Sequence, residues 1–400
     1  MMFVLKLKQM FLFGKKEKVF VVFDIGSGSV GGLLVRDSHK KGLEVLASAR
    51  TDIRFKEDID SHLFHRSLEE AFKKTTQSLR SKAHEAPDFV FCVLNSLLSV
   101  SQTRIIKVNK EKPFDINKKL LDDLILEETE IFKKTYVEEK GSSLPSSEIE
   151  LFEHNVMKFV LNGYDTVKPL GKRARQLDLY VYMSMGKAKV KEKIEDVLGE
   201  SFAGSPVIFR TFPFVVFNTL KLSTDTREGF VFVDIAGEVT DISLVRREVL
   251  EEIISFPMGR NFVLRKIGKA LNTLIKETSS VLSRLERGHS EEGATKKISK
   301  AMSDAKDEWC DIFKKAVGEV SEVSPLPQNL FVVGSDKIVE EFSICMEGDF
   351  FSQFTILGKP FNIKRISPES LDPSLKLSPS LKEEKDIFLI LETLFAGKFL

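Results

Sequence analysis

Two segments of the chain share one pattern, in which an apolar strand ends at an aspartate and a short turn of small residues leads into a second strand. The first reads VFVVFDIGSGSVGGLLV (19–35) and the second GFVFVDIAGEVTDISLV (229–245). Their aspartates, Asp24 and Asp234, stand 210 positions apart. Internal repetition on this scale predicts two similar lobes. The length of 400 residues agrees, because it exceeds the usual size of one domain.

The first segment also contains a literal G-x-G-x-x-G at Gly26, Gly28 and Gly31. A dinucleotide-binding fingerprint requires a helix after the glycine turn. Here VGGLLV (30–35) is followed by the turn-forming RDSHKKG and then by the strand-like LEVLASA. We therefore predict a meander of three strands and interpret the literal match as accidental.

A glycine-rich hairpin can still bind phosphate, because its backbone N–H groups point into a concavity that suits anions. Asp24 could orient Mg²⁺ through water, and Ser27 and Ser29 add hydroxyl donors. One such hairpin is a weak signal, since many serve turn geometry alone. If the two lobes face each other, the two acid-tipped hairpins would clamp a polyphosphate and its metal from both sides.

A third segment near the C-terminus, NLFVVGSDKIVEEF (329–342), reads as a buried strand, a turn at Gly334-Ser335 and a helix. The N-terminus of such a helix offers backbone donors to an anion. Taken by itself, a simple β–α turn is the more economical interpretation.

In order and spacing, the three segments resemble the motifs of the actin-like ATPase superfamily. The stretches DFVFCVLNSLLSVSQTRIIKVNKEKPFDINKKLLDDLILEETEIF and FEHNVMKFVLNGYDTVKPLGKRARQLDLYVYMSMGKAKVKEKIEDVL, between the first two motifs, look like the inserted SHS2 domain of the division protein FtsA and the pilus protein PilM. The stretch ISFPMGRNFVLRKIGKAL (254–271) is similar to the FtsA region after the second motif. The resemblance implies an α/β, actin-like (ribonuclease H-like) two-lobed ATPase fold with a small inserted α+β (SHS2) domain.

The same resemblance gives expected domain boundaries. They are a basic apolar N-terminal segment at 1–18, the first part of lobe 1 at 19–87, the SHS2-like insert at 88–203, a return to lobe 1 at 204–228, lobe 2 at 229–375 with a helical subdomain at about 260–324, and a C-terminal helix at 376–400 that docks on lobe 1. Because that helix is apolar, docking is favoured over the terminal membrane helix that FtsA carries.

The resemblance also implies ATP and Mg²⁺ as cofactors, with Asp24, Asp234 and Asp241 expected to hold the metal through water. The residues expected to bind the nucleotide are Asp24, Gly26, Ser27, Gly28, Ser29, Asp234, Gly237, Thr240, Asp241, Gly259, Gly334 and Ser335.

Departures from the family pattern argue against fast hydrolysis. In the second motif Ala236 and Glu238 replace glycines, and Glu238 adds a negative charge whose cost a metal ion or a lysine would have to offset. Val333 stands where the third motif has a glycine, and Phe212-Pro213 where active relatives have Glu-Pro. A phenyl ring cannot accept a proton from water. We expect ATP binding with weak or absent hydrolysis.

The function implied is an FtsA-like scaffold in the cytoplasm, peripheral at the inner face of the membrane, that organises cell-division proteins and can self-associate into filaments. The alternative is a PilM-like protein of type IV pilus assembly. A third alternative, of another class, is a sugar-kinase-like phosphotransferase, but that would need intact glycines in the second motif. A formal net charge of +1 argues against nucleic acid as a partner.

The N-terminal stretch MMFVLKLKQMFLFGKKEK is basic and apolar but too short to span a bilayer. It could lie on an anionic membrane surface, or it could be a frayed leader with initiation nearer Met10. The three cysteines, Cys92, Cys310 and Cys345, show no metal-ligand spacing, and we expect a buried thiol at each.

Overall fold

The computed structural model describes residues 17–38, 42–53, 61–139, 145–223, 228–274, 277–278, 280–281, 292–322, 324–334, 336–371 and 378–400. Residues 1–16 of the leader, on which the membrane expectation rests, and Ser335 of the expected site lie outside these residues.

Lobe 1 is built on a five-stranded sheet of order β3-β2-β1-β4-β9. The predicted meander forms its antiparallel half, with β1 (Lys18–Ile25), β2 (Ser29–Ser38) and β3 (Gly42–Asp52). Strands β4 (Phe89–Leu94) and β9 (Val207–Thr211) extend the sheet in parallel with β1. No helix separates β1 from β2, so the literal G-x-G-x-x-G lies in a hairpin.

Lobe 2 repeats this topology in the order β12-β11-β10-β13-β14. Its strands are β10 (Phe230–Ile235), β11 (Thr240–Arg246), β12 (Val249–Phe256), β13 (Asn329–Gly334) and β14 (Asn362–Arg365). The first three pair antiparallel and the last two run parallel to β10, as in lobe 1. The internal repeat inferred from the two aspartate motifs is therefore a repeat of whole sheets.

The central strands are buried on both faces, which explains their unbroken apolar sequences. Each sheet has one face covered by helices of its own lobe. Helices α2 (Ser61–Arg80) and α4 (Ala188–Ser201) cover lobe 1, while α6 (Arg260–Leu271), α8 (Glu292–Ser321) and α9 (Asp336–Met346) cover lobe 2.

The inner faces of the two sheets share one core with two further helices, α5 (Phe212–Ser223) and α11 (Ile387–Phe399). Phe20 and Val22 of β1 and Phe230 and Phe232 of β10 belong to this core. Helix α11, the C-terminal helix, packs against β1, β2 and α5. The lobes are therefore joined by apolar packing, with the polar site at the strand ends.

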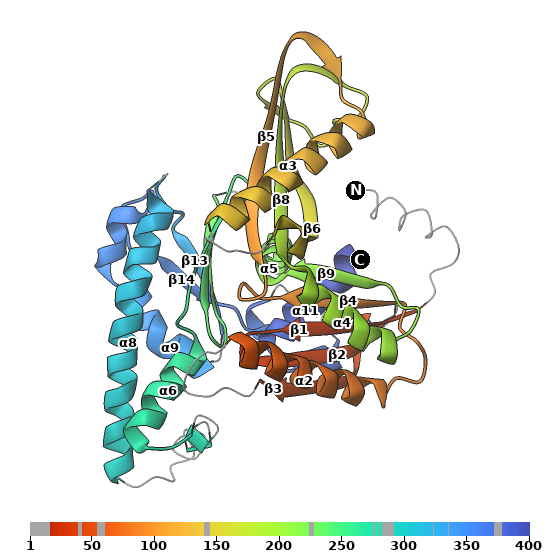
Figure 1. Ribbon diagram of the computed structural model, residues 1–400. Helices are drawn as coiled ribbons and strands as arrows, with labels where there is room; N and C mark the ends of the chain where they lie inside the picture. The colour runs from red at the N-terminus through yellow and green to blue at the C-terminus, as the bar shows by residue number, and fades with distance from the viewer. Residues whose placement is uncertain are drawn as a thin grey trace.

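A separate four-stranded antiparallel sheet of order β5-β8-β6-β7 interrupts lobe 1 between β4 and α4 and projects away from both lobes (Figure 1). Its strands are β5 (Val100–Asp115), β6 (Ile149–Leu161), β7 (Tyr164–Asp165) and β8 (Arg173–Lys187). Helix α3 (Lys118–Glu139) covers it, and η2 (Ser146–Glu148) precedes β6. Short elements η3 (Asp349–Phe354), η4 (Pro368–Ser370) and α10 (Pro379–Glu383) complete the described chain.

Two of the three cysteines differ from the expectation of free thiols. Cys310 of α8 and Cys345 of α9 are joined by a disulfide, because the packing of these helices brings their Cα atoms to 5.8 Å. Residues 35 positions apart in sequence gave no sign of this contact. Cys92 is a free, buried thiol as expected. Among the described helices, none combines the length and apolarity needed to cross a bilayer.

Candidate functional site

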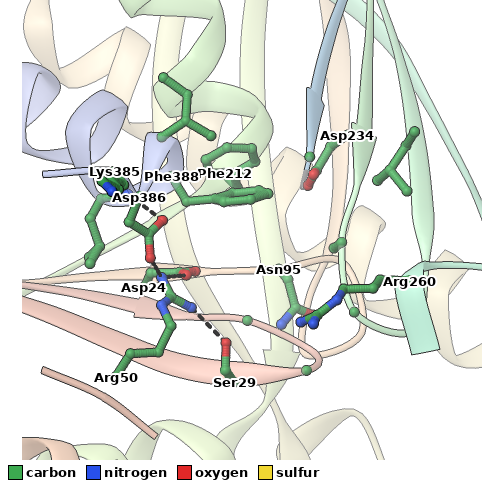
Figure 2. A pocket seen from close by; sticks show the side chains of 18 of the residues that line it. Asp24, Ser29, Arg50, Asn95, Phe212, Asp234, Arg260, Lys385, Asp386 and Phe388 are labelled. Carbon is green, nitrogen blue, oxygen red and sulfur yellow. Dashed lines mark hydrogen bonds and ion pairs between the residues drawn. The ribbon is translucent and has the colours of Figure 1, made fainter. Parts of the chain in front are cut away.

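A cavity of about 990 Å³ lies between the two lobes, where the hairpins of β1–β2 and β10–β11 face each other (Figure 2). Both lobes and the segment leading into α11 supply its walls. Its volume is at the upper end of the range for small-molecule sites. Asp24 and Asp234 stand on opposite sides of this one cavity, which is the arrangement that the paired motifs predict.

The first hairpin is tight and depends on glycine at its turn. The Gly26 N–H donates to the Ser29 carbonyl at 3.1 Å. A Cβ atom on Gly26 would lie 2.9 Å from that same carbonyl oxygen, so a larger residue would push the turn open. Asn95, at the end of β4, donates from its side chain to the Ile25 carbonyl at 2.7 Å and fixes the strand end that carries Asp24.

The second hairpin touches the first. The backbone N–H of Glu238 donates to the Ser27 hydroxyl at 2.9 Å. A Cβ atom on Gly237 would lie 2.3 Å from the Gly28 nitrogen, so two glycines facing each other permit this approach. The two lobes are therefore in direct contact at their hairpin tips.

One partly exposed arginine connects three parts of the site. Arg50 of β3 donates to the Asp24 carboxylate at 2.8 Å and to the Ser29 hydroxyl at 2.6 Å, and it forms an ion pair with Asp386. Gly31 faces Arg50 across the β2–β3 ladder, and a Cβ there would lie 2.3 Å from the guanidinium. Gly31 therefore makes room for a side chain that crosses the hairpin.

Burial raises the pKa of Asp24, although Arg50 counteracts this by stabilising the charged form. For Arg50, burial opposes the charged form, but the carboxylates of Asp24 and Asp386 outweigh it and raise the pKa. The opposite charges of Asp24 and Arg50 therefore offset part of the cost of burying each other.

The second hairpin carries two carboxylates opposite each other, because Asp234 and Asp241 are cross-strand neighbours. Asp241 accepts a hydrogen bond from Ser96 of lobe 1 at 2.7 Å. Asp234 Oδ1 is buried and has no hydrogen-bond partner among the described residues. Burial, followed by the nearby Asp241 and Asp24 carboxylates, raises the pKa of Asp234 well above its usual value. An orphaned carboxylate oxygen facing the cavity fits a cationic ligand or a proton.

The negative charge of Glu238, which was expected to repel a bound polyphosphate, is neutralised inside lobe 2. Its carboxylate receives hydrogen bonds from Arg265 at 2.7 and 3.0 Å and from Asn261 at 2.8 Å. The first amides of α6 are also engaged, because Arg260 and Asn261 donate to the carbonyls of Ala236 and Gly237. Helix α6 therefore holds the second hairpin in place, and Gly259 permits the contact, since a Cβ there would meet the Ala236 carbonyl oxygen at 2.4 Å.

Phe212, the first residue of α5, lines the cavity. Its ring packs against Phe388 at 5.1 Å and Phe232 at 6.2 Å between centroids. These contacts make this wall apolar, and Figure 2 shows Phe212 and Phe388 side by side above Asp24.

The predicted site residues that line the cavity are Asp24, Gly26, Ser27, Gly28, Ser29, Asp234, Gly237 and Gly334. Thr240 and Asp241, on β11 of the second hairpin, and Gly259, just before α6, are not among the lining residues. Thr240 donates to the Met258 carbonyl at 2.6 Å and accepts from the Trp309 indole at 3.1 Å, so it anchors the hairpin to lobe 2.

Sequence reasoning missed Arg50, Asn95, Asp386 and Phe388, all of which line the cavity. None of them lies in a turn motif. For Arg50 a signal existed: Gly31 is the partner that a crossing arginine requires, and it was visible as an unexplained glycine within a strand.

The site fits a magnesium nucleotide on two observations. The cavity is large enough, and Asp234 has a buried carboxylate oxygen without a partner among the described residues. No group of three or more potential ligand side chains is clustered for direct metal coordination within the described part of the chain. The carboxylates therefore suit a hydrated ion, and Mg²⁺ commonly keeps several waters.

Comparisons with known proteins show the fold. No protein-family model matches the chain. No curated protein matches it in sequence. A solved PilM–PilN complex of type IV pilus biogenesis is similar in structure with a TM-score of 0.60 and 15% identity, covering 96% of this chain and 98% of that chain.

Two further solved structures are more distant. The ethanolamine utilization protein EutJ from Carboxydothermus hydrogenoformans has a TM-score of 0.45 at 11% identity, covering 96% of this chain and 91% of its own. MreB 5 of Spiroplasma citri bound to AMPPNP has a TM-score of 0.36 at 11% identity, covering 88% and 92%. The chain has the two-lobed actin-like fold with an inserted α+β unit.

Proposed function

We propose that this chain is a nucleotide-binding actin-like scaffold of the PilM type, which binds ATP·Mg²⁺ between its lobes with little or no turnover. The observation that carries the proposal is the meeting of two acid-tipped hairpins, one from each lobe, at a single cavity. A ligand that contacts both hairpins favours one relative position of the lobes, and this is the means by which a slow ATPase can act as a switch.

Within the proposal, the chain's own residues divide into two sets. The turns at Gly26–Ser29 and Ala236–Glu238 would receive the phosphates, and Asp24 and Asp234 would hold the hydrated metal. A bound Mg²⁺ would supply charge neutralisation for the phosphates and for these carboxylates. Arg50 adds a fixed cation on the side of the first hairpin.

Slow turnover follows from Phe212. General-base catalysis needs a group that can take the proton of the attacking water, and a phenyl ring has none. Its packing against Phe388 and Phe232 makes this wall of the cavity apolar. No observation on the described residues favours a sugar kinase.

Pilus assembly is favoured over cell division because the PilM–PilN complex matches this chain over nearly its whole length. By analogy with that complex, the partner of this chain would be a PilN-like assembly protein. Self-association and contact of the N-terminal segment (1–18) with the inner face of the membrane belong to the same proposal.

Isothermal titration of the full chain with ATP in excess Mg²⁺ tests nucleotide binding. We expect a single site, weakened at least tenfold in Asp234→Asn, with the variant's folding verified by an undiminished melting temperature. Glu127→Gln on the exposed face of α3 serves as the control and should bind as the parent does. Absence of heat, or identical binding by Asp234→Asn, contradicts the proposal.

The pilus role is tested by co-purification with the PilN-like protein encoded in the same genome. A stable complex is the expected result. A genome that encodes a tubulin-like division protein beside this chain and no PilN-like protein would favour the division role instead.

A further inference from the structure

The far end of the inserted sheet, which we call the insert tip, consists of residues 109–119 and 161–176. Backbone hydrogen bonds tie these segments together: the Asn162 N–H donates to Gln176 at 3.0 Å, and the Gly171 N–H donates to Ile116 at 2.9 Å. Figure 1 shows this end of β5 and β8 as the part of the molecule farthest from the two lobes. The insert tip is remote from the cavity, so it has no part in the proposed nucleotide site.

The insert tip is strongly basic. It has eight basic side chains and three acidic ones, whereas the whole chain has a formal net charge of only +1. Two of the three acids are engaged in ion pairs, Asp115 with Arg173 at 3.2 Å and Asp165 with Lys158 at 2.8 Å. The basic residues are Lys110, Lys112, Lys118, Lys119, Lys168, Lys172, Arg173 and Arg175. The positive charge is therefore a local property of this tip.

Apolar side chains stand among these charges. Val167 is 94% exposed and Tyr164 is 78% exposed, with Leu170 close to them in sequence. The loop that carries Val167 is held in place, because the Thr166 N–H donates to Phe159 at 2.8 Å and the Lys172 N–H donates to Pro169 at 3.1 Å. The exposure of Val167 is thus imposed by the loop's hydrogen bonds, and three exposed apolar side chains within seven positions, Tyr164, Val167 and Leu170, indicate an interaction site.

We propose that the insert tip docks on an anionic lipid bilayer. Lysine and arginine near a bilayer are attracted to its negative surface potential, while tyrosine and a small apolar side chain enter the interface. Long basic side chains can keep their charges at the headgroups beside an inserted valine.

The shape of the tip favours a bilayer over an acidic protein segment. The tip projects outward, whereas extended strands and amphipathic helices of a partner bind at open sheet edges or in grooves. Strand β7, the edge at this end, is only two residues long. At the opposite edge the pairing of β5 shifts register between Asn109 and Phe114, which interrupts the ladder. Neither edge therefore offers a regular template for strand addition.

A tryptophan reporter tests where the chain touches the membrane. The natural Trp309 is fully buried and gives a constant background. Full-length Tyr164→Trp should show a blue shift of its emission with phosphatidylglycerol-containing vesicles and none with pure phosphatidylcholine vesicles. Leu274→Trp, which places the reporter at an exposed position of lobe 2, is the matched control and should show no shift.

A charge-matched pair of variants tests the mechanism. Each basic side chain near an anionic surface strengthens partitioning by about fivefold, so Lys168→Gln/Lys172→Gln/Arg175→Gln should weaken vesicle sedimentation by about 100-fold. Lys269→Gln/Lys297→Gln/Lys300→Gln on α6 and α8 removes the same charge from lobe 2 and should leave sedimentation nearly unchanged. Val167→Asp should weaken binding without any change in the melting temperature.

Three outcomes would overturn the proposal. The first is sedimentation without a blue shift at position 164, which would mean that another part of the chain contacts the lipid. The second is equal loss in the two charge-matched variants, which would mean that only net charge matters. The third concerns the Lys168→Gln/Lys172→Gln/Arg175→Gln variant. If it sediments with vesicles as the parent does but no longer binds polyglutamate, the tip recognises an acidic protein partner.

Discussion

The backbone N–H of Glu238 donates a hydrogen bond of 2.9 Å to the hydroxyl of Ser27, and this bond joins the tips of the two hairpins. It is accompanied by a second inter-lobe bond of 2.7 Å, from Ser96 to Asp241. Both bonds involve the elements that face the cavity. The position of lobe 2 relative to lobe 1 is therefore fixed at the proposed site as well as in the apolar core.

The glycine contact beneath that bond predicts a steric test. Gly237→Ala would place a Cβ 2.3 Å from the nitrogen and 2.4 Å from the Cα of Gly28. These are backbone atoms and cannot move aside as a flexible side chain would. We expect the hairpins to be pushed apart and the free energy of unfolding to fall by about 1–3 kcal/mol, measured by urea denaturation.

The control is Gly199→Ala on α4, where an added Cβ meets no atom within 4 Å. It should be neutral or stabilising by up to about 1 kcal/mol, because alanine favours helix more than glycine does. Equal stability of Gly237→Ala and the parent would mean that the hairpins are not in contact.

The ion pairs of Arg50 predict that replacing this residue with an uncharged one will lower the free energy of unfolding strongly. Arg50→Met leaves the carboxylates of Asp24 and Asp386 without their shared cation. Removing one partner of a buried pair costs about 3–5 kcal/mol, and the partial exposure of the guanidinium places our expectation at about 3 kcal/mol. Arg36→Met on β2, where the ion pair with Glu44 is solvent-exposed, should cost at most about 1 kcal/mol.

Asp386→Asn in the Arg50→Met background completes a double-mutant cycle. Because the second substitution removes a carboxylate that has already lost its partner, it should recover part of the lost stability. Additive losses would contradict a direct interaction between Arg50 and Asp386.

The raised pKa of Asp234 predicts that the folded state loses stability as the pH rises. Its raised pKa means that the folded state holds a proton that the unfolded state releases near pH 4. Stability must therefore fall as pH rises from the unfolded pKa toward the folded one. Asp234→Asn removes this loss, and we expect it to raise the free energy of unfolding at pH 8 by at least about 1 kcal/mol.

The measurement is urea denaturation between pH 5 and pH 8. The parent should lose more stability over this range than Asp234→Asn, while Asp24 and Asp241, whose pKa values burial also raises, keep part of the slope in both proteins. Asp196→Asn, on the exposed side of α4, should follow the parent. Parallel curves for the parent and Asp234→Asn would contradict a raised pKa.

The sequence predicted the parts of this molecule that depend on local pattern. Buried strands ending in Asp24 and Asp234 were visible because both faces of a central strand are apolar, and the hairpins were visible because small residues follow. The repeat of the two motifs then predicted the two sheets. The actin-like fold and the eight lining residues were expected from the resemblance to the actin-like ATPase superfamily that these motifs carry.

What the sequence did not predict depends on contacts between distant segments. Arg50, Asp386 and Phe388 enter the cavity through tertiary packing, from a strand end and from the segment leading into the C-terminal helix. The disulfide between Cys310 and Cys345 depends on how α8 and α9 pack. The neutralisation of Glu238 by Arg265 depends on helix α6 folding back on the second hairpin. Such pairings leave no periodic trace in one sequence.

Glu392, in the middle of the otherwise apolar helix α11, gives the last prediction. Its side chain is fully buried, and neither carboxylate oxygen has a hydrogen-bond partner among the described residues. Burial, followed by the Asp24 and Asp386 carboxylates, raises its pKa well above the usual value, and Arg50 opposes this only in part.

A buried polar group without a partner costs about 1–3 kcal/mol. Glu392→Met, which has a similar volume, should therefore raise the free energy of unfolding by about 2 kcal/mol at pH 7, as measured by urea denaturation, whereas Glu127→Met on the exposed face of α3 should change it by less than about 0.5 kcal/mol. If Glu392→Met is instead less stable than the parent, Glu392 has a stabilising partner, and the carboxylate belongs to the polar network of Arg50 and Asp24.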